Sequence, residues 1–143
     1  MHDCVFCKIA DKSIPSHIVY EDENVLAFLD VKPIHSGHTL VIPKEHSRNI
    51  FDISKENWQH TAEVVRSLAV SVKEAVGADG INLIMNNEGA AGQEVFHPHI
   101  HIIPRFEGDG ISTMPERVSS YEEMIHTQET ILEKIRSAHI KNI

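Results

Sequence analysis

The feature that most constrains this chain is a row of three histidines, His97, His99 and His101, spaced two residues apart. Successive side chains of a β-strand point to opposite faces, so this spacing predicts a strand that carries all three imidazoles on one face. Imidazole titrates near neutral pH and can act as a nucleophile, a base or a metal ligand. One such histidine alone would be read as solvated surface, but three on one face predict a functional site. The opposite, buried face would consist of Phe96, Pro98, Ile100 and Ile102.

The composition limits the classes of function. The chain has 143 residues, enough for one domain, and 13 basic against 21 acidic residues give it a net charge of −8. This charge excludes a general nucleic-acid binder, which needs a cationic surface, but allows a small anionic ligand bound by backbone dipoles. No apolar run reaches transmembrane length and the N-terminal residues do not resemble a signal peptide, so we expect a soluble cytoplasmic protein without membrane contact.

The two cysteines, Cys4 and Cys7, form a Cys-x-x-Cys pair near the N-terminus. In a reducing compartment, such a pair indicates metal or redox chemistry rather than a structural disulfide. The pair alone does not distinguish these roles.

The hydrophobic pattern predicts an α+β fold with an antiparallel sheet. Helices are expected at residues 5–10, at 54–76 and from 120 to about 138, and strands at 17–20, 25–29, 38–42, 81–86 and the histidine row. Ser54 and Gly77 are typical of the two ends of the long helix, and Ser120 with Glu123 forms a capping box. The antiparallel sheet is expected because the strands follow one another in meander order with the helices set apart. Because the sequence contains no internal repeat or second domain, we expect a single domain over residues 1–143.

Three ordered motifs give the chain its resemblance to a known family. They are the row from His97 to Ile103, the segment from His38 to His46, and the N-terminal Cys4-Val-Phe-Cys7-Lys-Ile. Together they resemble the histidine triad (HIT) superfamily of nucleotide hydrolases and transferases, above all bacterial members of its histidine triad nucleotide-binding branch. The resemblance spans about residues 4–106, and about 107–143 carry no signature. It implies a homodimer of five-stranded α+β protomers that binds a purine nucleoside phosphate.

The resemblance also implies the chemistry. The middle histidine, His99, would attack the α-phosphorus of a nucleotide and form a covalent nucleotidyl-histidine, which water then hydrolyses. His101 and the N–H groups of the glycine-bearing loop 89–93 would stabilise charge on the phosphoryl oxygens. Crowding of the imidazoles, including His97, would keep His99 unprotonated. His38 matches a histidine near the triad, although it could equally be a satisfied strand residue.

The nucleotide-binding positions carry over in the same way. The resemblance implies an apolar base pocket, a ribose-binding strand end and a phosphate-side loop, which correspond to Phe6, Ile9, Phe28, Asp30, Val31, Asn87, Gly92 and Gln93. From the sequence alone, the aromatic residues could be plain core, and Asp30 and Asn87 could be turn residues.

Glu94 departs from the family pattern, in which a serine is common. A carboxylate would repel phosphate, so we expect Glu94 to turn away from the site or to pair with a cation. The leaving-group preference stays open.

The resemblance further implies a zinc site formed by Cys4, Cys7, His46 and His97. Two thiolates and two imidazoles suit tetrahedral zinc, and related proteins, including the galactose-1-phosphate uridylyltransferases, use the matching positions. Four protein ligands would make the zinc structural and leave His99 free. The alternative is two inert, reduced cysteines.

Three functions remain open at this point. The first is a hydrolase of purine nucleoside phosphoramidates, acyl-adenylates or dinucleoside polyphosphates that releases AMP or GMP. The second is a zinc-stabilised nucleotide-binding or interaction module with little turnover. The third, a hydrolase that uses the three histidines as zinc ligands, is disfavoured because the cysteines are better ligands.

Overall fold

The computed structural model describes residues 3–112 and 114–138. The chain divides into two compact units, residues 1–109 and 110–143. The expectation of one domain over residues 1–143 therefore stays a prediction. Within the described residues, no helix combines the length and apolar character that crossing a membrane requires.

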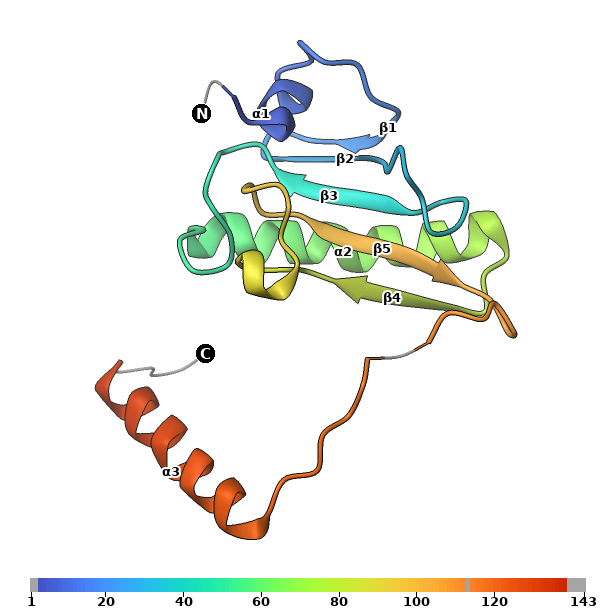
Figure 1. Cartoon of the computed structure of the whole chain (residues 1–143). Helices are drawn as coiled ribbons and strands as arrows, with labels where there is room; N and C mark the ends of the chain where they lie inside the picture. The colour runs from blue at the N-terminus through green and yellow to red at the C-terminus, as the bar shows by residue number, and fades with distance from the viewer. Residues whose placement is uncertain (1–2, 113, 139–143) are drawn as a thin grey trace. The chain divides into compact units, whose positions relative to one another are not determined.

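The first unit is a five-stranded antiparallel sheet with helices on both of its faces (Figure 1). Its elements are α1 (Val5–Ala10), β1 (Ile18–Glu21), β2 (Val25–Leu29), β3 (Thr39–Pro43), α2 (Lys55–Val76), β4 (Gly80–Ile84), the 3-10 turn η1 (Gly89–Ala91) and β5 (Ile100–Arg105). This confirms the α+β fold class and the five-stranded sheet.

The meander order is wrong for the last two strands, because the sheet runs β1-β2-β3-β5-β4. α2 connects β3 to β4, and β5 then returns between them and pairs with both. Burial explains the order: β5 has buried side chains on both faces, Ile100 and Ile102 on one and Ile103 on the other, whereas Asn82, Leu83 and Ile84 of β4 are exposed. The strand that buries more side chain occupies the interior position.

The sheet separates two hydrophobic clusters. Val25 and Ala27 of β2 face α2 and pack with Val41, Val64 and Val65. The alternate residues point to the opposite face, where they meet α1; this second cluster consists of Phe6, Ile9, Leu26, Phe28, Leu40 and Ile42. β2 and β3 therefore have a neighbouring strand on each side and are buried on both faces, as their unbroken apolar runs predict.

The ends of α2 follow the predicted signals. The Ser54 side chain accepts a hydrogen bond from the Asn57 N–H, and Gly77 adopts the left-handed conformation with φ of 65°. Glycine adopts this conformation at little cost, which makes Gly77 an effective helix stop.

The histidine row is not one continuous strand. β5 begins at Ile100, so His97 lies in a bend and His99 directly precedes the strand. Phe96 is also not on a buried face: its ring is exposed and stacks under the Arg48 guanidinium at 4.2 Å. Pro98 explains the irregularity, because it has no N–H for a sheet ladder and restricts the backbone of His97.

The second unit contains α3 (Tyr121–Ser137). The predicted capping box is present, since the Ser120 hydroxyl accepts from the Glu123 N–H and the Glu123 carboxylate accepts from the Ser120 N–H.

Candidate functional site

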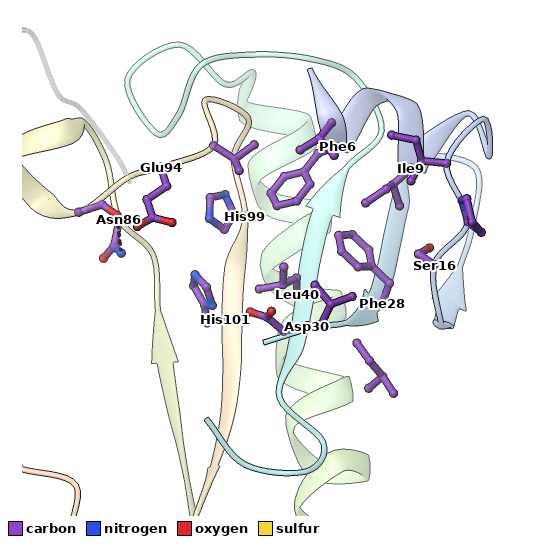
Figure 2. A pocket seen from close by; sticks show the side chains of 17 residues that line it. Phe6, Ile9, Ser16, Phe28, Asp30, Leu40, Asn86, Glu94, His99 and His101 are labelled. Carbon is purple, nitrogen blue, oxygen red and sulfur yellow. Dashed lines mark hydrogen bonds between the residues drawn. The ribbon is translucent and has the colours of Figure 1, made fainter. Parts of the chain in front are cut away.

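A cavity of about 560 Å³ lies on the α1 face of the sheet (Figure 2). This volume falls in the usual range for small-molecule sites. One end is apolar, formed by Phe6 and Ile9 of α1 together with Phe28 and Leu40. The Phe6 and Phe28 rings meet edge to face with centroids 5.6 Å apart, which suits a flat aromatic ligand.

The other end of the cavity is polar and contains His99 and His101, with Asn86 and Glu94 beyond them (Figure 2). The two imidazoles lie 5.1 Å apart between centroids, and the His99 ring also contacts the Phe6 ring at 5.0 Å. The cavity therefore joins an aromatic end to a pair of imidazoles.

His99 is held in one orientation. Its Nδ1 lies 2.7 Å from the His97 carbonyl oxygen, and only a protonated Nδ1 can donate this hydrogen bond. In the neutral ring, Nε2 then carries the free lone pair that a nucleophile needs. Burial lowers the pKa of His99, opposed by the hydrogen bond to His97 and the charge of Asp30, so the ring is neutral at pH 7.

His38 and His101 form a hydrogen-bonded pair beside His99. The Ile34 N–H donates to His38 Nδ1, which places the proton of neutral His38 on Nε2, and this N–H lies 2.9 Å from His101 Nδ1. His101 therefore carries its own proton on Nε2. Burial, His99 and His38 lower the pKa of His101 to about 4, so it acts as a neutral donor.

Asp30, His38 and His101 could offer ligand atoms to a metal, since these atoms lie within 4.8 Å of one another. The hydrogen bonds argue against that use, because the protonated Nε2 of His38 has no free lone pair. Asp30 Oδ2 lies 3.5 Å from the same Nε2, and Asp30 Oδ1 accepts from the Lys32 N–H. Asp30, His38 and His101 form a chain of polar contacts that fixes the positions of the imidazole protons.

The loop before the histidines differs from its predicted use at two positions. Asn87 lies outside the cavity and its side chain accepts a hydrogen bond from the Ile50 N–H. Gln93 is buried, with its oxygen accepting from the Glu88 N–H and from Asn49, and its nitrogen donating to two backbone carbonyls. Both residues shape the loop, whereas Asn86 and Gly92 line the cavity.

Glu88 holds this loop in a strained conformation. Its φ of 77° and ψ of 157° are rare for a residue with a side chain. The carboxylate is fixed by a two-pronged ion pair with Arg48 and by a hydrogen bond from Asn49. Gly92, with φ of 88°, closes the turn, so the loop has a defined shape at the polar end.

A second cluster lies next to the cavity and consists of Cys4, Cys7, His46 and His97. His97 is fully buried, does not line the cavity, and turns its Nδ1 toward both thiols at 3.6 Å. The prediction that all three histidine rings face one pocket is thus wrong for His97. Its ring belongs to this cluster, and its carbonyl orients His99.

The cluster has the dimensions of a zinc site. Zinc bonds of about 2.3 Å to sulfur and about 2.05 Å to nitrogen put tetrahedral ligands about 3.3 Å apart for two nitrogens and about 3.6 Å for a nitrogen and a sulfur. The Nδ1 atoms of His46 and His97 are 3.3 Å apart, and Cys7 Sγ is 3.3 Å from the first and 3.6 Å from the second.

Protonation within the cluster also fits a metal. His97 Nε2 lies 2.7 Å from the Pro43 carbonyl oxygen, so the proton sits on Nε2 and Nδ1 keeps its lone pair. Burial lowers the pKa of His97 to about 4, whereas burial and the neighbouring Cys4 raise the pKa of Cys7 to about 11. Without a cation the Cys7 thiol stays protonated. The four residues therefore offer a complete set of metal ligands only when a metal displaces that proton.

The remaining predicted positions line the cavity: Asp30 and Val31, which follow β2, and Phe6, Ile9 and Phe28. Their role in binding a nucleotide stays a prediction. Sequence reasoning missed Asn86 and Leu40, and it misplaced Glu94, which neither turns away nor forms an ion pair with a described residue. Alternation along the strand before the loop could have indicated Asn86, but nothing in the sequence locates the cavity wall.

Comparison with known proteins agrees with this geometry. The HIT domain model matches residues 11–108. Protein hit of Bacillus subtilis is 45% identical over 113 residues, which cover 78% of this chain and 78% of that protein. The chain is also similar to adenylylsulfatase HINT3 of Arabidopsis thaliana, with 42% identity over 76% of this chain and 55% of that longer protein.

A solved structure of a Zn-bound histidine triad family protein from Mycobacterium smegmatis matches with a TM-score of 0.74 and 39% identity, covering 96% of this chain and 98% of that one. The chain therefore belongs to the histidine triad (HIT) superfamily, whose members are in general nucleotide hydrolases and transferases.

Proposed function

We propose that this protein cleaves purine nucleoside phosphates at the α-phosphorus through a covalent intermediate on His99. The observation that carries the proposal is the orientation of this ring: Nδ1 donates to the His97 carbonyl, which leaves Nε2 unprotonated, and His99 lines a cavity with an aromatic end. A neutral, fixed imidazole is a competent nucleophile toward phosphorus.

The two steps use residues already described. His99 Nε2 attacks phosphorus, the bond to the leaving group breaks, and the leaving group departs with the electron pair and takes up a proton. Water then attacks phosphorus, the bond to His99 breaks, and the nucleoside monophosphate is released. The N–H at His101 Nε2 would donate to a phosphoryl oxygen during both steps, with the relay from His38 keeping its proton in place.

The cavity also supports a binding mode. The base would stack in the apolar end against Phe6 and Phe28, and the ribose hydroxyls would donate to Asp30 at the strand end. The substrates proposed are phosphoramidates, acyl-adenylates or dinucleoside polyphosphates of purine nucleosides, with AMP or GMP as product. All place a good leaving group on the phosphorus beside His99.

We also propose a structural zinc ion held by Cys4, Cys7, His46 and His97. Four protein ligands leave no open position, so when bound the ion supplies a cross-link between α1, the segment after β3 and the segment before His99. Because the His97 carbonyl orients His99, this cross-link would also fix the nucleophile.

A homodimer is the proposed assembly. β4 is the edge strand next to β5, and Leu83 and Ile84 on it are exposed. An exposed apolar edge favours pairing with a second copy. Light scattering would measure twice the mass of the chain, and a monomer at micromolar concentration would exclude this assembly.

The function is tested by AMP release from an adenosine phosphoramidate, with His99→Ala as the inactive variant and intact mass spectrometry to detect and locate the nucleotide adduct. We expect an adduct on His99 and a loss of at least about 1,000-fold in the variant. Equal, slow turnover by both proteins would reject the proposal. Tight AMP binding without turnover would instead support a nucleotide-binding module, which the enclosed aromatic end also allows.

A further inference from the structure

Glu94 occupies a distinctive place at the polar end of the cavity. Figure 2 shows its carboxylate directed toward Asn86 and His99, on the side of the imidazoles away from Phe6 and Phe28. A nucleotide with its base at the aromatic end and its α-phosphorus at His99 would extend its leaving group toward this end. Glu94 is therefore placed to meet the leaving group rather than the nucleoside.

Within the part of the chain that the structure describes, the Glu94 carboxylate forms no ion pair at the cavity wall. Asp30 and Glu94 line the cavity, whereas no lysine or arginine of the described residues does. The nearby Arg48 is paired with Glu88 through both of its carboxylate oxygens. The described residues thus leave a negative charge at the leaving-group end, which attracts cations and repels anions.

We infer that Glu94 determines leaving-group specificity and that the preferred substrates are nucleoside 5′-phosphoramidates of amines that carry a second, positively charged ammonium group. The inference rests on the proposed function and names its substrate class. The P–N bond breaks, the amine nitrogen keeps the electron pair and takes up a proton, and the attacking water returns a proton to solvent in the second step. The Glu94 carboxylate would repel the anionic leaving group of a nucleotide that releases sulfate or a nucleoside polyphosphate.

This preference separates the chain from one of its relatives. Adenylylsulfatase HINT3 is named for a substrate with an anionic leaving group. A negative charge at the leaving-group end would make adenylyl sulfate a poor substrate for the present chain. Specificity by repulsion of the wrong substrate is as effective as attraction of the right one.

The test uses three AMP phosphoramidates whose amines differ only at the far end: 1,3-diaminopropane with a terminal ammonium, propylamine with a methyl, and β-alanine with a carboxylate. The bond that breaks is the same type in all three, so differences in kcat/KM report the remote charge. Because Glu94 is exposed to solvent, an ion pair at about 6 Å from it should change binding by about tenfold at most. We expect kcat/KM to fall about 10- to 100-fold from the ammonium to the carboxylate compound at low ionic strength, and the ratio to shrink in salt.

The variants are Glu94→Gln, which removes the charge at nearly constant shape, and Glu23→Gln, which removes one charge from the exposed β1–β2 turn. Glu94→Gln should reduce the ammonium-to-carboxylate ratio to within about threefold of unity, whereas Glu23→Gln should leave the wild-type ratio unchanged. Glu94→Asp, which restores the charge, should recover most of the preference. Melting temperatures check that each variant is folded.

The outcomes distinguish this inference from the proposed function. Turnover of all three compounds with a ratio that Glu94→Gln does not change would keep the chemistry on His99 and overturn the role of Glu94. If nothing is turned over, the dissociation constants of the same three compounds decide. A charge preference in binding that Glu94→Gln removes would then support the role of Glu94 and reject the proposed enzymatic activity. Equal affinities for the three compounds would overturn both the role of Glu94 and the proposed activity.

Discussion

At the scale of single residues, hydrogen bonds at the cavity determine which nitrogen of each histidine carries the proton. Each of the three imidazoles has its tautomer set by a neighbour: a carbonyl oxygen for His99, a backbone N–H for His38, and the His38 N–H for His101. One ring therefore offers a lone pair to the cavity and another an N–H. In the proposed mechanism, the nucleophile His99 and the donor His101 differ in role because their hydrogen-bond partners differ, although both are imidazoles.

The pH dependence follows from burial of these rings. Burial lowers the pKa of His99 and lowers that of His101 to about 4, compared with about 6.5 for free histidine. We expect the midpoint of the acid decline in kcat/KM to lie below pH 6.5, as the rings gain protons. A profile measured with the propylamine phosphoramidate checks this, and a midpoint at or above 6.5 would contradict the described burial.

His38 provides a second prediction at this scale. His38→Phe keeps an aromatic ring but removes the donor to His101 Nδ1, so the tautomer of His101 is no longer set. We expect a loss in kcat of about 10- to 100-fold, as is typical when the partner that orients an active histidine is removed. The matched control is His17→Gln, an exposed histidine that does not line the cavity. Equal activity of the two variants would show that the relay does not contribute.

At the scale of elements, the loop between β4 and β5 depends on one buried amide. Gln93 links the strained Glu88 to Asn49 and to the backbone at Arg48 and Val95. Its four hydrogen bonds leave the amide almost fully satisfied inside the protein. The loop thus gains its shape from a residue that does not line the cavity.

Replacing Gln93 tests this role. Gln93→Leu keeps the volume but leaves the Glu88 N–H and two carbonyls without partners, which should lower the free energy of unfolding by about 2 kcal/mol. KM should rise as the loop loosens. Chemical denaturation measures the first and steady-state kinetics the second, with Gln59→Leu on the exposed face of α2 as the control. Unchanged stability would mean that the loop is held by other contacts.

The cysteine segment is the other element with a testable role. α1 carries Cys7 and follows its cap Cys4, whose sulfur accepts the Cys7 N–H. We expect about one zinc per chain by elemental analysis and almost none in a Cys4→Ser, Cys7→Ser double variant. Chelation of the wild type should lower its melting temperature and leave that of the double variant unchanged. Equal zinc contents would reject the site.

At the scale of the whole molecule, the sheet positions both sites from one face. β5 carries His101 and Ile102 inside the sheet. The bend before β5 places His97 in the cluster with the two cysteines and His46, and it places His99 in the cavity. All residues of the cavity and the cluster belong to the unit formed by residues 1–109.

This arrangement has a consequence for stability in acid. The folded pKa of His97, about 4, lies below the value of about 6.5 expected in the unfolded chain, so the unfolded state binds more protons between these values. The stability contribution of neutral His97 is complete above pH 6.5 and is lost as the pH falls toward 4. In the metal-free protein, the free energy of unfolding should decline over this range, and His97→Asn should flatten the decline. A pH-independent stability would contradict it.

The sequence by itself determined the elements and the chemical inventory. Local signals suffice for helix ends such as Ser54 and Gly77, for the apolar runs of β2 and β3, and for the residue types of a nucleophile and of a thiol-rich cluster. These features depend on neighbours along the chain, which is where propensity and periodicity act.

Only the tertiary structure decided the order of β4 and β5, the division of the histidine row and the position of Glu94. Each depends on contacts between segments far apart in sequence: β5 against β3, His97 against Pro43 and the cysteines, and Glu94 beside His99 in a cavity closed by α1. Period-two alternation assumes a regular strand, and Pro98 breaks that regularity. The rings therefore point where packing and hydrogen bonds hold them, which no local pattern encodes.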